Sequence, residues 1–448
     1  MAPYLVHSPS DREAMLGELG LDSLEPLLSD VPAQLRIQAL DLPEGLSEPE
    51  VMERVRGLAG RNVAFADRLT FRGGGIYRRF IPAAVPAVTG KSEFYTAYTP
   101  YQPEASQGWL QSIFEFQTLI AELTGLDVAN ASLYDGATAL AEAAMMAVVQ
   151  TGRKQVVVAG YLHPEYRDVL AGFALGRKFN VLHAAAPHGL IDPADLAAQV
   201  DGETAAVIFQ QPNFLGLVED AGGLTAAAHA AGALAIACVD PISLAILAPP
   251  GAYGADVAVG EGQQLGLAPS FGGPHVGFLA TRQELIRRLP GRLVGEAFDA
   301  RGRRGYVLTL QAREQHIRRE KATSNICTNH ALCALAASVY LAYMGPDGLR
   351  EVAEVSLSRA HHLARRLAEV AGFEPAFPEA PFFNEFPIRV GDARGLERRL
   401  VEQGILGPLP AGRWFPELAD VAIACCTELN DPEALELLVA ASREAVRA

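Results

Sequence analysis

The stretch AIACVDPISLAILAPPGAYGADVAVGEGQQLGLAPSFGGP, residues 235–274, decides the fold of this chain. It predicts a buried strand that ends in Asp240, a loop, a second buried strand that ends near Gly260, and then a polar turn followed by a glycine-rich run. Short, continuous apolar runs of this kind are typical of parallel strands that are covered on both faces. A carboxylate at the end of such a strand needs a partner.

Two strands arranged in this way carry the cofactor in one large group of pyridoxal-phosphate (PLP) enzymes. There an aspartate at the end of the first strand keeps the pyridine nitrogen protonated, and the turn after the second strand carries the lysine that forms the Schiff base. In this chain the turn contains Gln263 and Gln264 and no lysine. The alternative role for Asp240 is to cap the turn at Pro241.

Strands and helices alternate on both sides of this stretch, from about residue 126 to residue 281. Apolar strands are expected at 155–160, 180–184, 205–210, 233–240 and 255–260, and helices at 137–150, 164–177, 193–200 and 224–231. A last strand at 275–280 follows the glycine-rich run closely, so we expect it to be antiparallel to its neighbour. The pattern predicts an α/β fold with a mostly parallel sheet. The arrangement of residues 235–274 within it resembles the PLP-dependent aminotransferase-like type (fold type I).

Three domains are expected. Residues 1–92 form an N-terminal helical arm that binds a neighbouring subunit or domain, 93–318 form the large α/β domain, and 319–448 form a smaller C-terminal α+β domain.

Two more groups lie at element ends where a PLP site would need them. Asp135, Gly136 and Thr138 open a helix, whose backbone N–H groups and threonine hydroxyl could hold a phosphate. His163 follows a strand, where its imidazole could stack on a flat cofactor ring. The commoner explanations are a capped helix start for the first group and a capping residue for His163.

Composition and charge exclude several classes of partner. Lysine and arginine total 37 against 52 acidic residues, so the formal net charge is −15. An acidic chain has no electrostatic attraction for nucleic acid or an anionic membrane surface, and no apolar run is long enough to span a bilayer. No metal-ligand spacing is present, and the five cysteines are an odd number. We therefore expect a cytoplasmic protein with reduced cysteines and no metal site.

Only four residues could form a Schiff base, because the chain has four lysines: Lys91, Lys154, Lys178 and Lys321. Lys154 directly precedes a predicted strand, which is the wrong end of the sheet. Lys91 and Lys178 have no acid or strand end beside them. Lys321 is the best candidate, although it follows the last strand of the sheet. A self-sufficient PLP enzyme that uses Lys321 is therefore one alternative.

Four longer motifs resemble the P-protein family, the glycine decarboxylases of the glycine cleavage system. They are TPYQPEASQG (99–108), LTGLDVANASLYDGATALAEA (123–143), GGPHVGFLA (272–280) and REKATSNICT (319–328). The similarity covers nearly the whole chain. Some members are one long chain with two homologous halves, and others are two subunits. This chain resembles the N-terminal half, which lacks the Schiff-base lysine.

The resemblance implies a function for the assembly. PLP is expected on the lysine of a homologous partner subunit, with two copies of each chain. Glycine is decarboxylated there, and the aminomethyl group passes to the lipoyl arm of H-protein. Asp135, Gly136, Thr138, His163 and Asp240 would then be vestigial positions.

The resemblance leaves this chain no catalytic residue of its own, but its tyrosine-rich loop could reach the partner's site. Tyr95, Tyr98 and Gln102 are the expected contributors. A second alternative is a non-catalytic scaffold subunit, which contributes no group to the site.

Overall fold

The computed structural model describes residues 6–37, 40–65 and 68–447 of the chain. It divides into two compact units, Met1–Asp67 and Arg68–Ala448. The arm was expected to extend to residue 92, but residues 68–92 belong to the larger unit. One reason is that β1 (Leu69–Thr70) pairs in parallel with β13 (Ile405–Leu406), near the other end of the chain.

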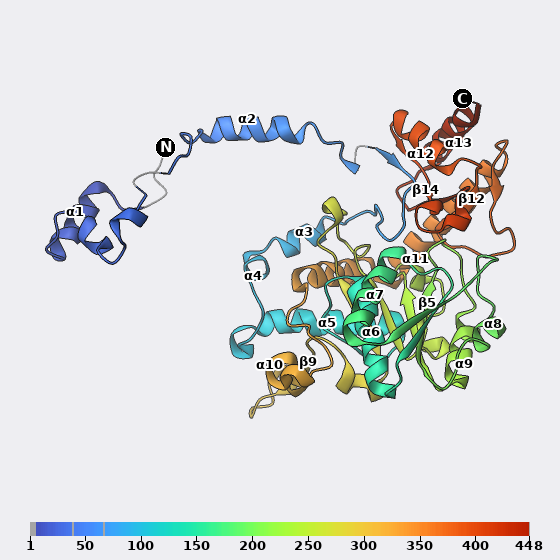
Figure 1. Cartoon of the computed structure of the whole chain (residues 1–448), viewed down its shortest axis with the longest axis horizontal. Helices are drawn as coiled ribbons and strands as arrows, with labels where there is room; N and C mark the ends of the chain where they lie inside the picture. The colour runs from blue at the N-terminus through green and yellow to red at the C-terminus, as the bar shows by residue number, and fades with distance from the viewer. Residues whose placement is uncertain (1–5, 38–39, 66–67, 448) are drawn as a thin grey trace. The chain divides into compact units, whose positions relative to one another are not determined.

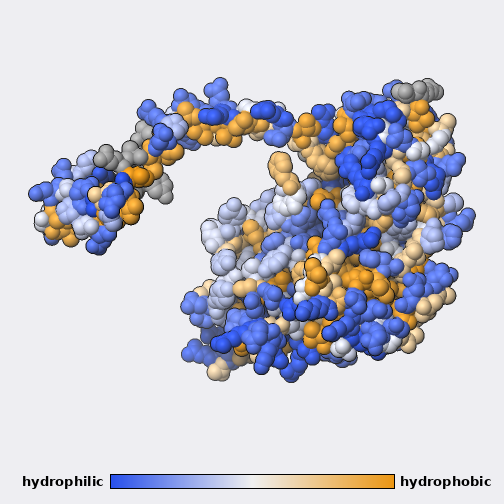
Figure 2. Space-filling model, viewed as in Figure 1, coloured by the Kyte–Doolittle hydropathy of each residue, from blue (hydrophilic) through white to orange (hydrophobic). Residues whose placement is uncertain are grey.

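The smaller unit is helical and has no core in the part that is described. Its α-helices are α1 (Pro9–Glu18) and α2 (Glu48–Ala59), and no residue in 6–37 or 40–65 is buried. Apolar side chains are therefore exposed, including those of Val51, Val55 and Leu58 in α2. Figure 2 shows hydrophobic residues along one side of this segment.

A seven-stranded sheet forms the centre of the larger unit, with the order β2-β8-β7-β6-β5-β3-β4 (Figure 1). The strands are β2 (Val128–Ala129), β3 (Gln155–Ala159), β4 (Asn180–Ala184), β5 (Thr204–Gln211), β6 (Leu234–Val239), β7 (Val257–Glu261) and β8 (Gly277–Thr281). Strands β3 to β7 pair in parallel, whereas β8 is antiparallel to β7, as the sequence predicts.

The central strands are buried on both faces because their alternate side chains enter two different cores. Val157 and Phe209 belong to a core with helices α5, α9 and α11, whereas Val158 and Ile208 belong to a core with α6 and α7. The covering helices are α5 (Gln107–Thr124), α6 (Gly136–Thr151), α7 (Pro164–Arg177), α8 (Pro193–Ala197) and α9 (Ala221–Ala230). The continuous apolar strands of the sequence follow from this double burial.

The C-terminal region is a small α+β domain around a four-stranded antiparallel sheet of order β11-β12-β15-β14. Its elements are β11 (Glu374–Pro375), β12 (Glu385–Arg389), α12 (Ala393–Glu402), β14 (Leu409–Pro410), β15 (Val421–Cys425) and α13 (Pro432–Arg447). The remaining elements of the larger unit are α3 (Ala84–Thr89), α4 (Ser92–Tyr95), the hairpin of β9 (Val294–Phe298) and β10 (Arg304–Leu308), and α10 (Gln315–Arg318).

The long helix α11 (Ala331–Ala368) connects the two domains of the larger unit. It is broken at Gly345 and Pro346, where Gly345 has φ 61°. Its length and composition would suit a membrane span, but half of its most apolar window is buried inside the protein. The helix contributes to the core under the large sheet, so its apolar character serves packing.

Candidate functional site

Residues predicted at the strand ends meet in one small cavity at the carboxyl edge of the large sheet. It is lined by Gly75, Tyr77, His163, Tyr166, Gln210, Cys238, Val239, Asp240, Pro241, Glu261 and Gln264. Its volume is about 40 Å³. A cavity needs ~10–15 Å³ of this kind of volume to hold one water molecule, and small-molecule sites typically enclose ~300–1,000 Å³. The cavity is therefore too small for an organic cofactor.

Asp240 directly follows β6, and both of its carboxylate oxygens are bound within the chain. Oδ1 accepts hydrogen bonds from the backbone N–H groups of Ile242 (2.8 Å) and Ser243 (2.9 Å), which caps the turn. Oδ2 accepts a hydrogen bond from Nε2 of Gln264 at 2.5 Å. An amide in the turn where a lysine would stand thus occupies the oxygen that a pyridinium would need.

Gln263 and Gln264 also bind the strap, which we define as residues 72–82. The backbone N–H of Tyr77 donates to Oε1 of Gln263 at 3.0 Å, and Nε2 of Gln263 donates to the Tyr77 carbonyl at 3.1 Å. Nε of Arg79 donates to Oε1 of Gln264 at 2.9 Å. The turn after β7 therefore fastens the strap over the pocket.

A buried acid that the sequence analysis missed lies against the strap. Glu385, the first residue of β12, accepts hydrogen bonds from the Tyr77 hydroxyl (2.6 Å) and from the backbone N–H of Gly74 (2.7 Å). Burial raises the pKa of Glu385 to about 7. A Cβ on Gly73 would overlap the Glu385 carboxylate. Three successive glycines, 73–75, were the available signal, because a backbone that passes this close to a side chain requires glycine.

The start of α6 is satisfied by carboxylates of the chain itself. Oδ1 of Asp135 caps the helix by accepting a hydrogen bond from the backbone N–H of Thr138 at 2.7 Å. The backbone N–H of Gly136 donates to Oε2 of Glu261 at 2.9 Å. A Cβ on Gly136 would overlap the hydroxyl of Tyr166, so the tyrosine closes the space above the helix start.

His163 is the N-cap of α7, and both of its ring nitrogens have partners. Nδ1 accepts a hydrogen bond from the backbone N–H of Glu165 at 3.2 Å, so the proton on Nε2 is donated to the carbonyl of Gly74 at 2.8 Å. The ring centroid lies 4.7 Å from that of Tyr166 and 5.1 Å from that of Phe214. Burial lowers the pKa of His163. The imidazole is therefore neutral and packed against residues of its own chain.

The whole chain matches one protein family. The family model described as glycine cleavage system P-protein matches residues 2–441. The chain belongs to the P-protein family. A protein of Carboxydothermus hydrogenoformans, named probable glycine dehydrogenase (decarboxylating) subunit 1, is 50% identical over 438 residues, which are 97% of this chain and 98% of that protein.

Solved structures agree with this assignment. A crystal structure of glycine decarboxylase (P-protein) of the glycine cleavage system, in inhibitor-bound form, is 48% identical, has a TM-score of 0.90 and covers 99% of this chain and 100% of its own. A structure of C-DES with glycine covalently linked to its PLP cofactor is 17% identical, has a TM-score of 0.62, and covers 85% and 97% of the two chains. The P-protein chain therefore has the fold type I architecture, as the sequence predicts.

The pocket of this P-protein chain does not fit PLP. The cavity has room for only a few water molecules. The backbone N–H of Gly136 donates a hydrogen bond to Glu261, and Oδ2 of Asp240, the oxygen that does not cap the turn, accepts one from Gln264. All four lysines lie in the described part of the chain, and the side chains of all four are exposed: Lys91, Lys154, Lys178 and Lys321. No step of the reaction can be assigned to a cofactor in this pocket.

The tyrosine-rich loop lies elsewhere, beside the start of α11. Tyr95 and Tyr98 are 69% and 78% exposed, and they line a groove of about 290 Å³ with Asn329 and His330. Within the described part of the P-protein chain neither tyrosine hydroxyl makes a hydrogen bond. Gln102 is exposed but does not line this groove.

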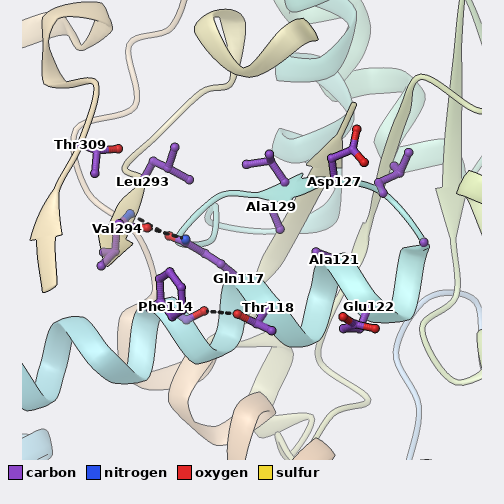
Figure 3. A pocket seen from close by; sticks show the side chains of 14 residues that line it. Phe114, Gln117, Thr118, Ala121, Glu122, Asp127, Ala129, Leu293, Val294 and Thr309 are labelled. Carbon is purple, nitrogen blue, oxygen red and sulfur yellow. Dashed lines mark hydrogen bonds between the residues drawn. The ribbon is translucent and has the colours of Figure 1, made fainter. Parts of the chain in front are cut away.

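A larger hollow, of about 520 Å³, lies between α5, β2 and the start of β9 (Figure 3). Gln117 spans its floor, because its Nε2 donates to the Val294 carbonyl at 3.0 Å and its Oε1 accepts from the Val294 N–H at 2.9 Å. Its lining contains no basic side chain and none of the residues predicted for the P-protein site. We assign it no part in the chemistry.

Proposed function

We propose that this chain is the lysine-free subunit of a two-chain glycine decarboxylase and that it supports an active site on a homologous partner subunit. One observation carries the proposal: the polar groups of this pocket are paired with other groups of the same chain, and none of the four lysines lines the pocket. The relatives' name, glycine dehydrogenase (decarboxylating) subunit 1, supports the existence of a second subunit.

The overall reaction follows from the family. Bound to the partner's lysine, PLP would accept the electrons that are released as carbon dioxide leaves glycine. The aminomethyl group then passes to the lipoyl arm of H-protein. The groups of this chain bind the partner, form one wall of its site and exclude water from it. Two copies of each chain, in the cytoplasm, complete the proposal, since sites of this fold are commonly built at a dimer interface.

Tyr95 and Tyr98 are the side chains that we propose reach the partner's site. Within the residues that the structure describes, their hydroxyls make no hydrogen bond, and their rings border an open groove. Tyr95→Phe and Tyr98→Phe remove only the hydroxyl. We expect each to lower kcat/KM about 10- to 100-fold, the loss of about 1.4–2.7 kcal/mol expected for hydrogen bonds of this kind. Assembly with the partner, measured by analytical ultracentrifugation, should be unchanged.

Gln102 supplies the matched comparison, because it is in the same loop but outside the groove. Gln102→Ala should change turnover less than either tyrosine variant. If the tyrosine variants lose assembly and keep their turnover per assembled complex, the chain is a scaffold and does not contribute to the site.

Borohydride trapping tests the proposal that the partner subunit, and not this chain, forms the Schiff base with PLP. The purified chain is mixed with PLP, alone and then with the partner subunit, and visible absorption is recorded before reduction. With this chain alone we expect only the absorption of free PLP and no protein aldimine band, and in the mixture we expect label on the partner chain only. Lys321→Ala should leave the band of the mixture unchanged. Specific label on Lys321 would instead show a self-sufficient enzyme.

A further inference from the structure

We propose that Glu261 is an internal substitute for a phosphate group: its carboxylate fills an anion site at the start of α6 and so closes this pocket to phosphorylated ligands. The inference goes beyond the proposed function, because it concerns the chain's own pocket and holds whatever partner the chain binds. It identifies a residue that closes the pocket independently of the missing lysine.

The contacts of Glu261 come from three separate segments. Oε2 accepts the hydrogen bond from the backbone N–H of Gly136 at 2.9 Å. Oε1 accepts hydrogen bonds from the backbone N–H groups of Gln263 at 2.9 Å and Val276 at 3.1 Å. Nδ1 of His275 lies 3.4 Å from the same oxygen. Three amide donors and one imidazole around a single anion make a built site, in which the ligand is a side chain.

The geometry matches the requirements of a phosphate site. Backbone N–H groups at the start of a helix attract an anion, because they lack helical partners and lie at the positive end of the helix dipole. The helix α6 is preceded by an extended Asp135, and Gly136 leaves no room for a Cβ beside Tyr166. Tyr166 occupies that side of Gly136, and the Glu261 side chain reaches the Gly136 N–H from the end of β7.

The opposite end of the pocket is filled in the same way. There the amide of Gln264 binds Asp240, and the strap supplies Tyr77 and Gly75 to the wall. The polar groups that could anchor the two ends of a phosphorylated ring are thus both paired with side chains of the turn after β7. Restoring a lysine to this turn would not by itself reopen the phosphate end.

The test uses the full chain and inorganic phosphate. Glu261→Ala removes the internal ligand and leaves its donors free. In chloride we expect the variant to melt at a lower temperature than the wild type. In about 100 mM phosphate of equal ionic strength it should regain about 2 °C more than the wild type does, and 31P NMR should show broadening only with the variant. Glu284→Ala, at an exposed position, should respond as the wild type does.

Glu261→Gln keeps the volume of the side chain and removes its charge. The Glu261 carboxylate, whose Oε1 lies 3.4 Å from Nδ1 of His275, is the main cause that raises the pKa of His275, so an NMR titration of Glu261→Gln should show that pKa decrease. This second variant keeps the inference testable if Glu261→Ala does not fold. Phosphate binding by the wild type, no extra phosphate response in folded Glu261→Ala, or an unchanged His275 pKa in Glu261→Gln would each overturn the inference.

Discussion

Arg79→Ala is expected to lower the free energy of unfolding by about 3–5 kcal/mol, the usual effect of removing one member of a buried ion pair. The Arg79 side chain is 1% exposed. Its Nη1 donates to Ser356 Oγ and Glu428 Oε2, both at 2.8 Å, and its Nε donates to Gln264. The variant leaves the Glu428 carboxylate without its counter-charge. Urea denaturation followed by circular dichroism measures the loss.

Arg78→Ala is the matched control, since Arg78 is the neighbouring arginine on the same strap. Among the described residues its side chain makes one hydrogen bond, to the Arg68 carbonyl at 3.4 Å, so its loss should cost less than about 1 kcal/mol. Equal stabilities of the two variants would show that the strap is not fastened through Arg79. The proposal that the strap holds the pocket in its present form would then lose the contacts of Arg79 as evidence.

Removal of residues 1–67, the smaller unit, is expected to weaken binding of the partner subunit at least about 100-fold, which corresponds to about 2.7 kcal/mol. In residues 6–37 and 40–65 no side chain is buried, although many are apolar. Buried apolar area contributes about 25 cal/mol per Å², so a modest contact with the partner would supply this energy. A chain that begins at residue 68 should keep its melting temperature and lose affinity, as measured by isothermal titration calorimetry.

A narrower test addresses one face of α2. Val55→Ser combined with Leu58→Ser replaces exposed apolar side chains that are three residues apart on one face of the helix. Glu53→Ala changes the opposite face and serves as the control. The apolar double variant should weaken association, whereas Glu53→Ala should not. If the shortened chain binds normally but melts at a lower temperature, the arm packs on its own chain.

The large sheet could be predicted because its signals are local. Continuous apolar runs separated by amphipathic helices give nearly the same strands that the structure contains, and β8 is antiparallel as expected. The turn at Gln263 and Gln264 was found by its distance from Asp240 along the chain. Capping was also foreseeable, because Asp135, His163 and Asp240 each accept hydrogen bonds from backbone groups two or three residues onward.

The strap and its partners could not be predicted in the same way. Glu385 lies 308 residues from Tyr77, and Glu428 lies 349 residues from Arg79. No periodic pattern in the sequence connects residues so far apart. Glutamate is a residue type that is mostly exposed, so the sequence does not indicate that Glu385 is buried. The glycines at 73–75 indicated a close approach but not what is approached.

The sequence by itself determined that this chain has a fold type I architecture and no lysine at the turn after β7, because both depend on residue order within short segments. Only the tertiary structure decided that the polar groups of the pocket are paired with one another. Gly136, Glu261 and Val276 lie on different segments, and Tyr77 and Arg79 arrive from the N-terminal strap. These donors and acceptors either bind one another or remain available to a ligand. Which of the two happens depends on distances that only folding establishes.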